Sequence, residues 1–232
     1  MSDDHFSRIY AYRYPVFGHP EQRAAVWSEV ASYLFEIMGR PARLLDPGGG
    51  RGEFINAVPA VERWLLDKQE SPVGSIDPDV NVLIGNVFDL SLPFDYFDGV
   101  FVSNFLEHLY SPNDIARFLG KMFASQAPGG SIAVVGPNFR YSCKSYYDCA
   151  DHWVPLTHIS VDEHLHGAGY IVERVIPRFL PLSFKGRLPP SKSLTRTYLR
   201  LPLAWRIFGR QFLVVGKKPS DRQRPNSGPD NS

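Results

Sequence analysis

Short apolar runs alternate with amphipathic segments along most of this chain of 232 residues. Apolar positions at three- and four-residue steps predict a helix from Pro20 to about Met38, ended by Gly39. Further helices are predicted over 112–124 and from Ser160, where Ser160 and Glu163 have capping-box spacing. Seven apolar runs predict strands. Five of them lie at 61–66, 80–88, 97–105, 127–138 and 211–218, and the other two begin the segment 43–60 and end the segment 160–176.

This alternation predicts an α/β domain whose mostly parallel sheet has helices on both faces. Ligands of such sheets bind beyond the carboxyl ends of the strands, at the switch point of strand order. Pro72, Gly74 and Pro78 leave little room for a helix over 68–79. No repeat or linker interrupts the chain before 219, so we expect one domain over 1–218.

Both ends of the chain differ from this core. The N-terminal arm, 1–19, places Tyr10, Tyr12 and Tyr14 on one side if it is extended. It is predicted either to cover the active site or to pack on the sheet edge. The tail over 219–232 is rich in Pro, Ser, Asn and Asp, and a disordered segment is expected there.

Composition indicates a globular protein, with 44% hydrophobic and 13% aromatic residues. The polar N-terminal sequence and the two cysteines favour a cytoplasmic protein without a disulfide scaffold, and no apolar run has the length of a membrane span.

Charge is unevenly distributed along the chain. Residues through Glu173 hold 12 Lys and Arg against 22 Asp and Glu, whereas residues from Arg174 hold 13 against 2. The basic segment 174–218 therefore indicates an anionic partner, or pairing with the acidic half.

The segment "LLDPGGGRGEF", 44–54, carries the most specific chemistry. Glycine is needed where the backbone turns with positive φ or where a ligand leaves no space for a Cβ. The nicotinamide-binding loop reads GxGxxG, but Glu53 occupies the third glycine position. An acid followed by GxGxG instead resembles the first motif of class I S-adenosylmethionine-dependent methyltransferases.

Later segments resemble the same family in the same order. Asp67 ends the second strand, where the family carries an acid that accepts hydrogen bonds from the ribose hydroxyls. Asp77 competes for this role, but it leaves no room for a crossover before the next strand. "GNVFDL", "FDGVFVSNFLEHL" and "APGGSIAVVGPN" resemble the third to fifth motifs, so the likeness covers about 40–217 and is greatest to the type 11, 12 and 23 small-molecule enzymes. Pro47 and Arg51 depart from the usual pattern.

The resemblance implies a Rossmann-like class I methyltransferase fold, with a seven-stranded sheet whose last strand is antiparallel. It implies S-adenosylmethionine as the cofactor and S-adenosylhomocysteine as the product. The residues that it places around this cofactor are Asp46, Gly48, Gly49, Gly50, Gly52, Asp67, Asn86, Val87, Phe88, Asn104, Phe105 and Leu106. Asn86 stands where Asp is common, and its amide oxygen can still accept from the adenine amine.

Catalytic candidates follow the fifth strand, where this fold presents loops to the substrate. His152 or His158 could remove a proton from the acceptor, and Asp151 could orient that base. Either histidine could instead cap a helix or pack in the loop. His108 is expected to shape the cofactor pocket. The spacing of Cys143, Cys149, Asp151, His152 and His158 fits no compact zinc pattern, so no metal site is expected.

Residues 193–210 have an apolar stripe, Leu194, Tyr198, Leu201, Trp205 and Phe208, with arginines off it. A helix interrupted at Pro202 is predicted, either docked on the domain, in contact with a membrane surface, or holding a phosphate-bearing substrate. The aromatic residues are not interleaved with the basic ones, which argues against nucleic acid.

These observations favour O-methylation of a small molecule or glycan, with an anionic, nucleotide-linked or lipid-linked acceptor suited to the basic segment. A non-catalytic module that binds the cofactor or a partner is the alternative, and the glycine spacing argues against a nicotinamide-dependent oxidoreductase. The sequence names neither the acceptor atom nor the oligomeric state.

Overall fold

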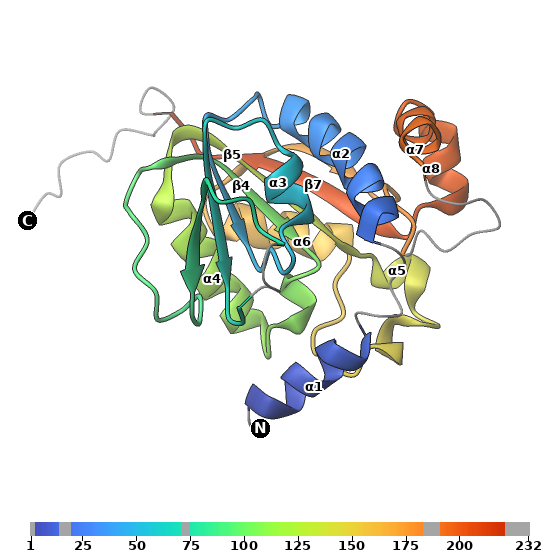
Figure 1. Ribbon diagram of the computed structural model, residues 1–232, viewed down its shortest axis with the longest axis horizontal. Helices are drawn as coiled ribbons and strands as arrows, with labels where there is room; N and C mark the ends of the chain where they lie inside the picture. The colour runs from blue at the N-terminus through green and yellow to red at the C-terminus, as the bar shows by residue number, and fades with distance from the viewer. Residues whose placement is uncertain (1–2, 14–19, 71–74, 183–190, 221–232) are drawn as a thin grey trace, which may run out of the picture.

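A computed structural model describes residues 3–13, 20–70, 75–182 and 191–220. A seven-stranded sheet runs through its centre in the order β3-β2-β1-β4-β5-β7-β6 (Figure 1). The strands are β1 (Arg43–Pro47), β2 (Glu62–Asp67), β3 (Val80–Ile84), β4 (Phe97–Ser103), β5 (Gln126–Pro137), β6 (Ile171–Ile176) and β7 (Gln211–Lys217). The pairs β1–β2, β1–β4, β2–β3 and β4–β5 are parallel, whereas β7 is antiparallel to both β5 and β6. The predicted fold, with its antiparallel last strand, is confirmed.

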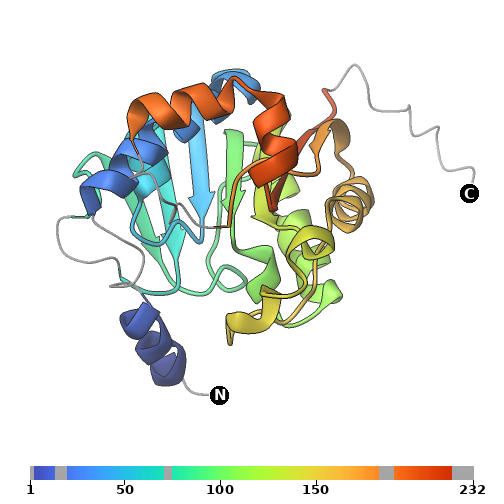
Figure 2. The same ribbon diagram turned by 90° about the vertical axis from the view of Figure 1, so that its right-hand side faces the viewer.

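Helices cover both faces of the sheet (Figures 1 and 2). The helical elements are α1 (Asp3–Arg13), α2 (Pro20–Ile37), α3 (Glu53–Ala57), η2 (Leu106–His108), α4 (Pro112–Ser125), α5 (Phe139–Ser142), η3 (Tyr146–Asp148), α6 (His158–Gly167), α7 (Lys192–Leu199) and α8 (Pro202–Phe208). Residues of α2, α3, α7 and α8 share one hydrophobic cluster, and residues of α4 and α6 share the other.

The alternation of side chains along the strands produces these two layers. In β1, Leu44 packs with the α2 cluster and its neighbour Leu45 with the α4 cluster. In β4, Phe101 points into the first cluster, and Val100 and Val102 into the second. Successive side chains of a strand point to opposite faces, so a strand that is apolar throughout is buried on both sides.

The connection from β2 to β3 contains no helix in its described parts, 68–70 and 75–79, as expected. Asn56, at the end of α3, holds this connection, since its amide nitrogen donates to the Ser75 carbonyl at 2.6 Å. Because no helix covers the edge strand there, Val82 and Ile84 of β3 remain exposed. This edge of the sheet is therefore exposed to solvent at these residues.

The helix start predicted at Ser160 is wrong, and two conditional expectations are narrowed. Residues 3–13 of the N-terminal arm form α1, so the arrangement expected for an extended arm does not apply to them; Tyr14 lies outside the described residues. Helix α6 begins at His158, because Thr157 forms the capping box with Ser160 one turn before the predicted one. The stripe over 193–210 docks only in part, since Leu194, Leu201 and Phe208 are exposed. Of the predicted tail, only 219 and 220 are described.

Candidate functional site

The glycine loop follows β1 at the carboxyl edge of the sheet. Gly48, Gly50 and Gly52 have φ values of 73°, 56° and 74°, in the left-handed region that favours glycine. A Cβ on Gly48 would overlap the Phe105 ring, and one on Gly49 would lie 2.8 Å from Oδ2 of Asp46. The loop is therefore held close to its neighbours, and its backbone forms an open cradle that side chains would fill.

Asp46 lies beneath this loop and is 3% exposed. Burial raises the pKa of Asp46 well above its ordinary value, and the nearby Asp67 and Glu53 raise it further. The structure thus places this predicted cofactor residue under the glycine backbone, where it supports the loop.

Asp67 connects the end of β2 to the same loop. Its Oδ2 accepts a hydrogen bond of 2.9 Å from the Gly50 N–H, and its Oδ1 accepts one of 3.0 Å from the Gln69 N–H. Asp77, the competing acid, instead accepts from Arg63 at 3.2 Å, and Arg63 lies near the start of β2 rather than its end. Only Asp67 of the two is positioned at the loop.

The third motif follows β3 and turns back toward α4. The side-chain oxygen of Asn86 accepts a hydrogen bond of 3.0 Å from the Phe88 N–H, which fixes its direction. Val87 is buried in the α4 cluster, and the Arg117 guanidinium lies 4.6 Å from the centre of the Phe88 ring. Asn86 is exposed and available to a ligand, whereas Val87 belongs to the core.

The fourth motif closes the other side of the loop. Asn104 is exposed and has a φ of 48°, an uncommon conformation for a residue other than glycine. The Phe105 ring lies between Gly48 and Phe118, 4.8 Å from the centre of the Phe118 ring, and Leu106 is buried.

The residues at this edge fit the expected cofactor. An acid, exposed amide groups and a glycine cradle without side chains suit a nucleoside with an amino-acid tail. Buried Asp46, Val87 and Leu106 support this surface from below.

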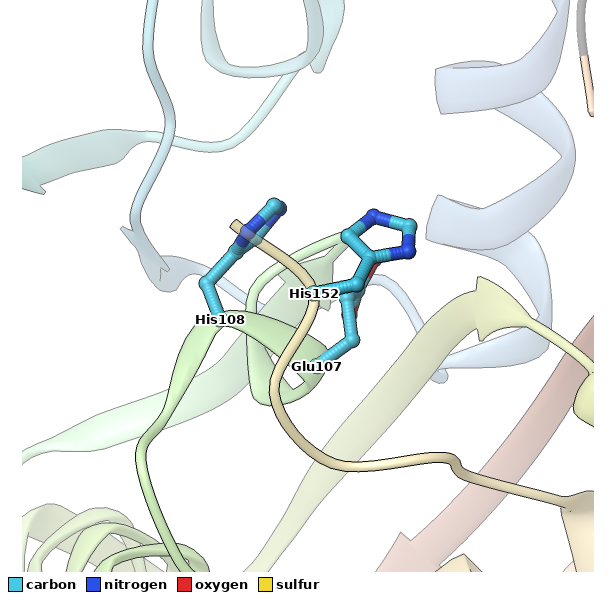
Figure 3. Close-up of side chains that lie close together, drawn as sticks. All are labelled: Glu107, His108 and His152. Carbon is cyan, nitrogen blue, oxygen red and sulfur yellow. The ribbon is translucent and has the colours of Figure 1, made fainter. Parts of the chain in front are cut away.

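A second group of polar side chains lies next to the fourth motif (Figure 3). Glu107 and His108 belong to η2, and His152 lies in the loop after η3. The Trp153 N–H donates to the Glu107 carbonyl at 2.8 Å, which holds the loop against η2. The two imidazole rings have their centres 5.0 Å apart. We call Glu107, His108 and His152 the η2 cluster.

Asp151 orients His108, not the predicted bases. Nδ1 of His108 lies 2.9 Å from the Asp151 carbonyl and 3.2 Å from its Oδ2, and Arg13 of α1 donates to Oδ1 at 2.5 Å. Burial opposes the charge on Asp151, but the hydrogen bonds from His108 and Arg13 outweigh it, and the pKa of Asp151 falls below its ordinary value. For His108, burial lowers the pKa, while Asp151 and Glu107 together raise it above its ordinary value. The contact also places α1 at this edge of the sheet (Figure 1).

Burial disfavours the charged forms of both His152 and Glu107. Burial, helped by the charge of His108, lowers the pKa of His152 to about 4. Burial raises the pKa of Glu107 above its ordinary value. Nδ1 of His152 and Oε1 of Glu107 are buried and have no hydrogen-bond partner among the described residues.

His158 occupies a structural position. The Asn138 amide nitrogen donates to the Pro177 carbonyl at 2.8 Å and lies 2.9 Å from Nδ1 of His158. Because an amide nitrogen only donates, Nδ1 of His158 accepts and Nε2 carries the proton. In this tautomer Nε2 of His158 carries a hydrogen atom, so it can donate a hydrogen bond but cannot accept a proton. Its arrangement does not suit the predicted role of base, and no hydrogen bond among the described residues links it to Asp151.

The η2 cluster was missed as a unit because its members come from segments more than forty residues apart. The sequence signal was present in "LEHL", whose His108 the resemblance assigns to the cofactor pocket.

Arg196, a candidate for anion capture, instead donates two hydrogen bonds of 2.8 and 2.7 Å to Glu29 of α2. No helix in the described part of the chain is long and apolar enough to cross a membrane.

Comparison with known proteins agrees with this arrangement. Residues 39–134 match a sequence family described as a methyltransferase domain. No curated protein sequence matches the chain.

Solved structures give the same fold. A SAM-dependent methyltransferase from Archaeoglobus fulgidus has a TM-score of 0.64 at 21% identity, over 90% of this chain and 99% of that one. A possible histamine N-methyltransferase from Thermotoga maritima has a TM-score of 0.60 at 16% identity, over 92% of this chain and 96% of that one. A putative Haloferax volcanii methyltransferase, solved with the Trm112 activator, has a TM-score of 0.59 at 17% identity. That match covers 84% of this chain and 90% of the other. The motif order and the family match over 39–134 show that the chain carries a methyltransferase domain, and its fold is that of S-adenosylmethionine-dependent methyltransferases.

Proposed function

We propose that this methyltransferase modifies an oxygen atom of a small-molecule or glycan acceptor. The observation that carries the proposal is the adjacency of two sites. Phe105 contacts the glycine loop at Gly48, and the η2 cluster begins two residues later at Glu107. When bound, S-adenosylmethionine supplies an electrophilic methyl group, so the protein chiefly has to align an acceptor with it.

On the cofactor side, Asp67 would accept from the ribose hydroxyls while Gly50 fixes its orientation. Asn86 would accept from the adenine amine, since a carbonyl oxygen can receive a second hydrogen bond beside that from Phe88. Asp46 would act indirectly, by supporting the loop.

On the acceptor side, the η2 cluster favours an oxygen nucleophile. A hydroxyl must lose its proton as it attacks, and carboxylate and imidazole groups are those that accept protons or hold an oxygen atom. His158 is removed from the proposed bases by its hydrogen bond with Asn138. Asp151 acts through His108, which makes it a positioning residue.

The segment α7–α8 supports contact with an anionic membrane surface. Leu203 and Ile207 of α8 are 72% and 62% exposed, and Leu201 and Phe208 at its ends are exposed as well. Arg200, Arg206 and Arg210 lie in the same stretch of chain, and no acid occurs between Arg174 and Lys218. Exposed apolar residues among basic ones are typical of an interfacial helix. Such a surface would suit a lipid-linked acceptor.

The proposal is tested by supplying S-[methyl-³H]adenosylmethionine with acceptors of four classes: phenols, sugars, nucleotide sugars and lipid-linked saccharides. Transfer to oxygen in one class, lost in Asp67→Ala, is the expected result. Transfer only to nitrogen or carbon acceptors added as further arms would contradict the oxygen assignment. Tight cofactor binding without transfer to any acceptor would favour the non-catalytic module.

A further inference from the structure

We propose that the η2 cluster, Glu107, His108 and His152, binds a divalent transition-metal cation of the zinc type. One donor atom from each of the three side chains lies within 4.8 Å of the other two (Figure 3). Two of the three come from the short helix after β4 and the third from the loop after η3. Trp153 fixes that loop to Glu107, so the arrangement belongs to the fold and not to one mobile side chain.

Two buried atoms in the cluster lack partners. Oε1 of Glu107, on a residue that is 1% exposed, and Nδ1 of His152 have no hydrogen-bond partner among the described residues. A buried polar atom that makes no hydrogen bond destabilises the folded protein, so two of them side by side are unusual. A cation between them would satisfy both lone pairs at once.

The third donor has the surroundings of a metal ligand. Nδ1 of His108 is engaged by Asp151, which leaves Nε2 as its ligating atom. Ligating histidines are commonly oriented by a carboxylate on their other nitrogen, which fixes the tautomer and raises ligand basicity. Asp151 is in turn held by Arg13, so His108 is oriented before any cation arrives.

The donor set selects the class of metal. Two imidazoles and one carboxylate are ligands of zinc and similar first-row cations, and magnesium prefers oxygen ligands alone. Donor atoms at about 2.1 Å from a tetrahedral ion lie about 3.4 Å apart, so modest side-chain rotations close the cluster. Three protein ligands leave a position open for an exogenous group, as in catalytic zinc sites.

The position of the cluster gives the cation a role that rests on the proposed function. An acceptor hydroxyl in the open position would have its pKa lowered, and its proton would pass to water. His152 is then a ligand, which replaces its predicted role as base. The sequence-based expectation of no metal site is revised accordingly. That expectation considered His152 together with Cys143, Cys149, Asp151 and His158, and it considered neither Glu107 nor His108.

The experiment is a titration of the full, chelator-treated chain with Zn²⁺, Co²⁺ and Mg²⁺, each alone, followed by calorimetry and by the visible absorption of Co²⁺. We expect one equivalent of Zn²⁺ or Co²⁺ per chain and much weaker Mg²⁺ binding. Glu107→Gln and His152→Gln should weaken binding at least tenfold. His166→Gln, an exposed histidine of α6, is the matched control and should bind as the wild type does.

A second measurement on the wild type does not depend on whether the variants fold. Of the seven histidines in the chain, only His108 and His152 should shift strongly in ¹⁵N NMR spectra when Co²⁺ is added. Absence of stoichiometric binding, shifts at other histidines only, or a proton shared between Glu107 and His152 that persists with excess Zn²⁺ would each overturn the proposal. Metal binding is scored without S-adenosylmethionine, so its failure is distinguishable from failure of the methyl-transfer proposal.

Discussion

The carboxylate of Asp67 and the backbone N–H of Gly50 form a hydrogen bond of 2.9 Å between the end of β2 and the glycine loop. The bond orients an acid that is seventeen residues away in sequence toward the loop that β1 leads into. The other oxygen is oriented by Gln69, so the carboxylate is held at both atoms before a ligand binds. Such preorganisation reduces the ordering that binding would otherwise require.

Replacing Asp67 with Ala should weaken S-adenosylmethionine binding by about 10- to 100-fold, because hydrogen bonds to a charged group contribute about 1.5–3 kcal/mol. Calorimetric titration with the cofactor and with S-adenosylhomocysteine measures the change. Asp77→Ala is the matched control, since the Asp77 carboxylate pairs with Arg63. Equal losses in the two variants would show that Asp67 has no specific role.

Replacing Gly48 with Ala should impair both folding stability and cofactor binding. The variant combines a positive φ with overlap between the new Cβ and the Phe105 ring. Gly129→Ala is a close control, because Gly129 has a φ of 82° and a Cβ added there would meet no other atom of the described residues within 4 Å. Positive φ alone costs an alanine about 1–2 kcal/mol. Chemical denaturation should therefore show a larger loss for Gly48→Ala, and only that variant should lose cofactor affinity.

Much of this fold follows from the sequence because its signals are local. Apolar runs separated by amphipathic segments specify buried parallel strands, and the glycine loop after Leu45 identifies the edge where ligands bind. The sequence also predicts the absence of a helix from the described parts of the connection between Asp67 and Val80, since prolines and glycines occupy that stretch.

The errors arise where several residues compete for one role. Thr157 and Ser160 both satisfy the rule for a helix N-cap, and spacing to Glu163 favoured the wrong one. Asp151 was assigned to neighbouring His152, although tertiary packing brings His108 and Arg13 to it instead. Contacts across forty or more residues leave no period or spacing in the sequence, so the η2 cluster could only be found in three dimensions.

Acidic substitutions on α8 test the membrane surface. Leu203→Asp with Ile207→Asp should abolish co-sedimentation with vesicles rich in phosphatidylglycerol, because the apolar contact is lost and negative charge is added. Val61→Asp, an equally polar change at a residue that is 90% exposed elsewhere, should leave sedimentation unchanged. If the wild-type protein does not co-sediment with these vesicles at low salt, the proposed membrane contact is excluded.

Lys218 is expected to contribute strongly to stability. Its ammonium group is buried and lies 2.6 Å from Asp95 and 2.7 Å from the carbonyl oxygens of Phe123 and Gln126. Lys218→Met would leave these acceptors without their donor, and we expect a loss of about 3 kcal/mol in the free energy of unfolding. Urea denaturation measures it, with the exposed neighbour Lys217→Met as the control. A loss no greater than that of the control would contradict the assignment.

The pair of Asp98 and Arg43 should make stability depend on pH in the acid range. The Asp98 carboxylate accepts from the backbone N–H of Arg43 at 3.0 Å and from Nη2 of its guanidinium at 2.8 Å. The hydrogen bond from the Arg43 side chain lowers the pKa of Asp98, against the opposing effect of burial. A lowered folded-state pKa stabilises the protein fully above the ordinary Asp pKa of about 3.9, and this contribution is lost as pH falls through the folded-state value.

Asp98→Asn should therefore lower the free energy of unfolding at pH 7 by about 1 kcal/mol, a modest value because both side chains are about one-third exposed. The difference from the wild type should shrink as the pH falls below about 4, where the wild-type carboxylate becomes protonated. Thermal denaturation of both proteins between pH 7 and pH 2 measures this convergence. Glu36→Gln, which breaks the more exposed pair with Arg40, should have a smaller effect at pH 7. A difference between Asp98→Asn and wild type that stays constant to pH 2 would show that the ionised carboxylate does not stabilise the fold.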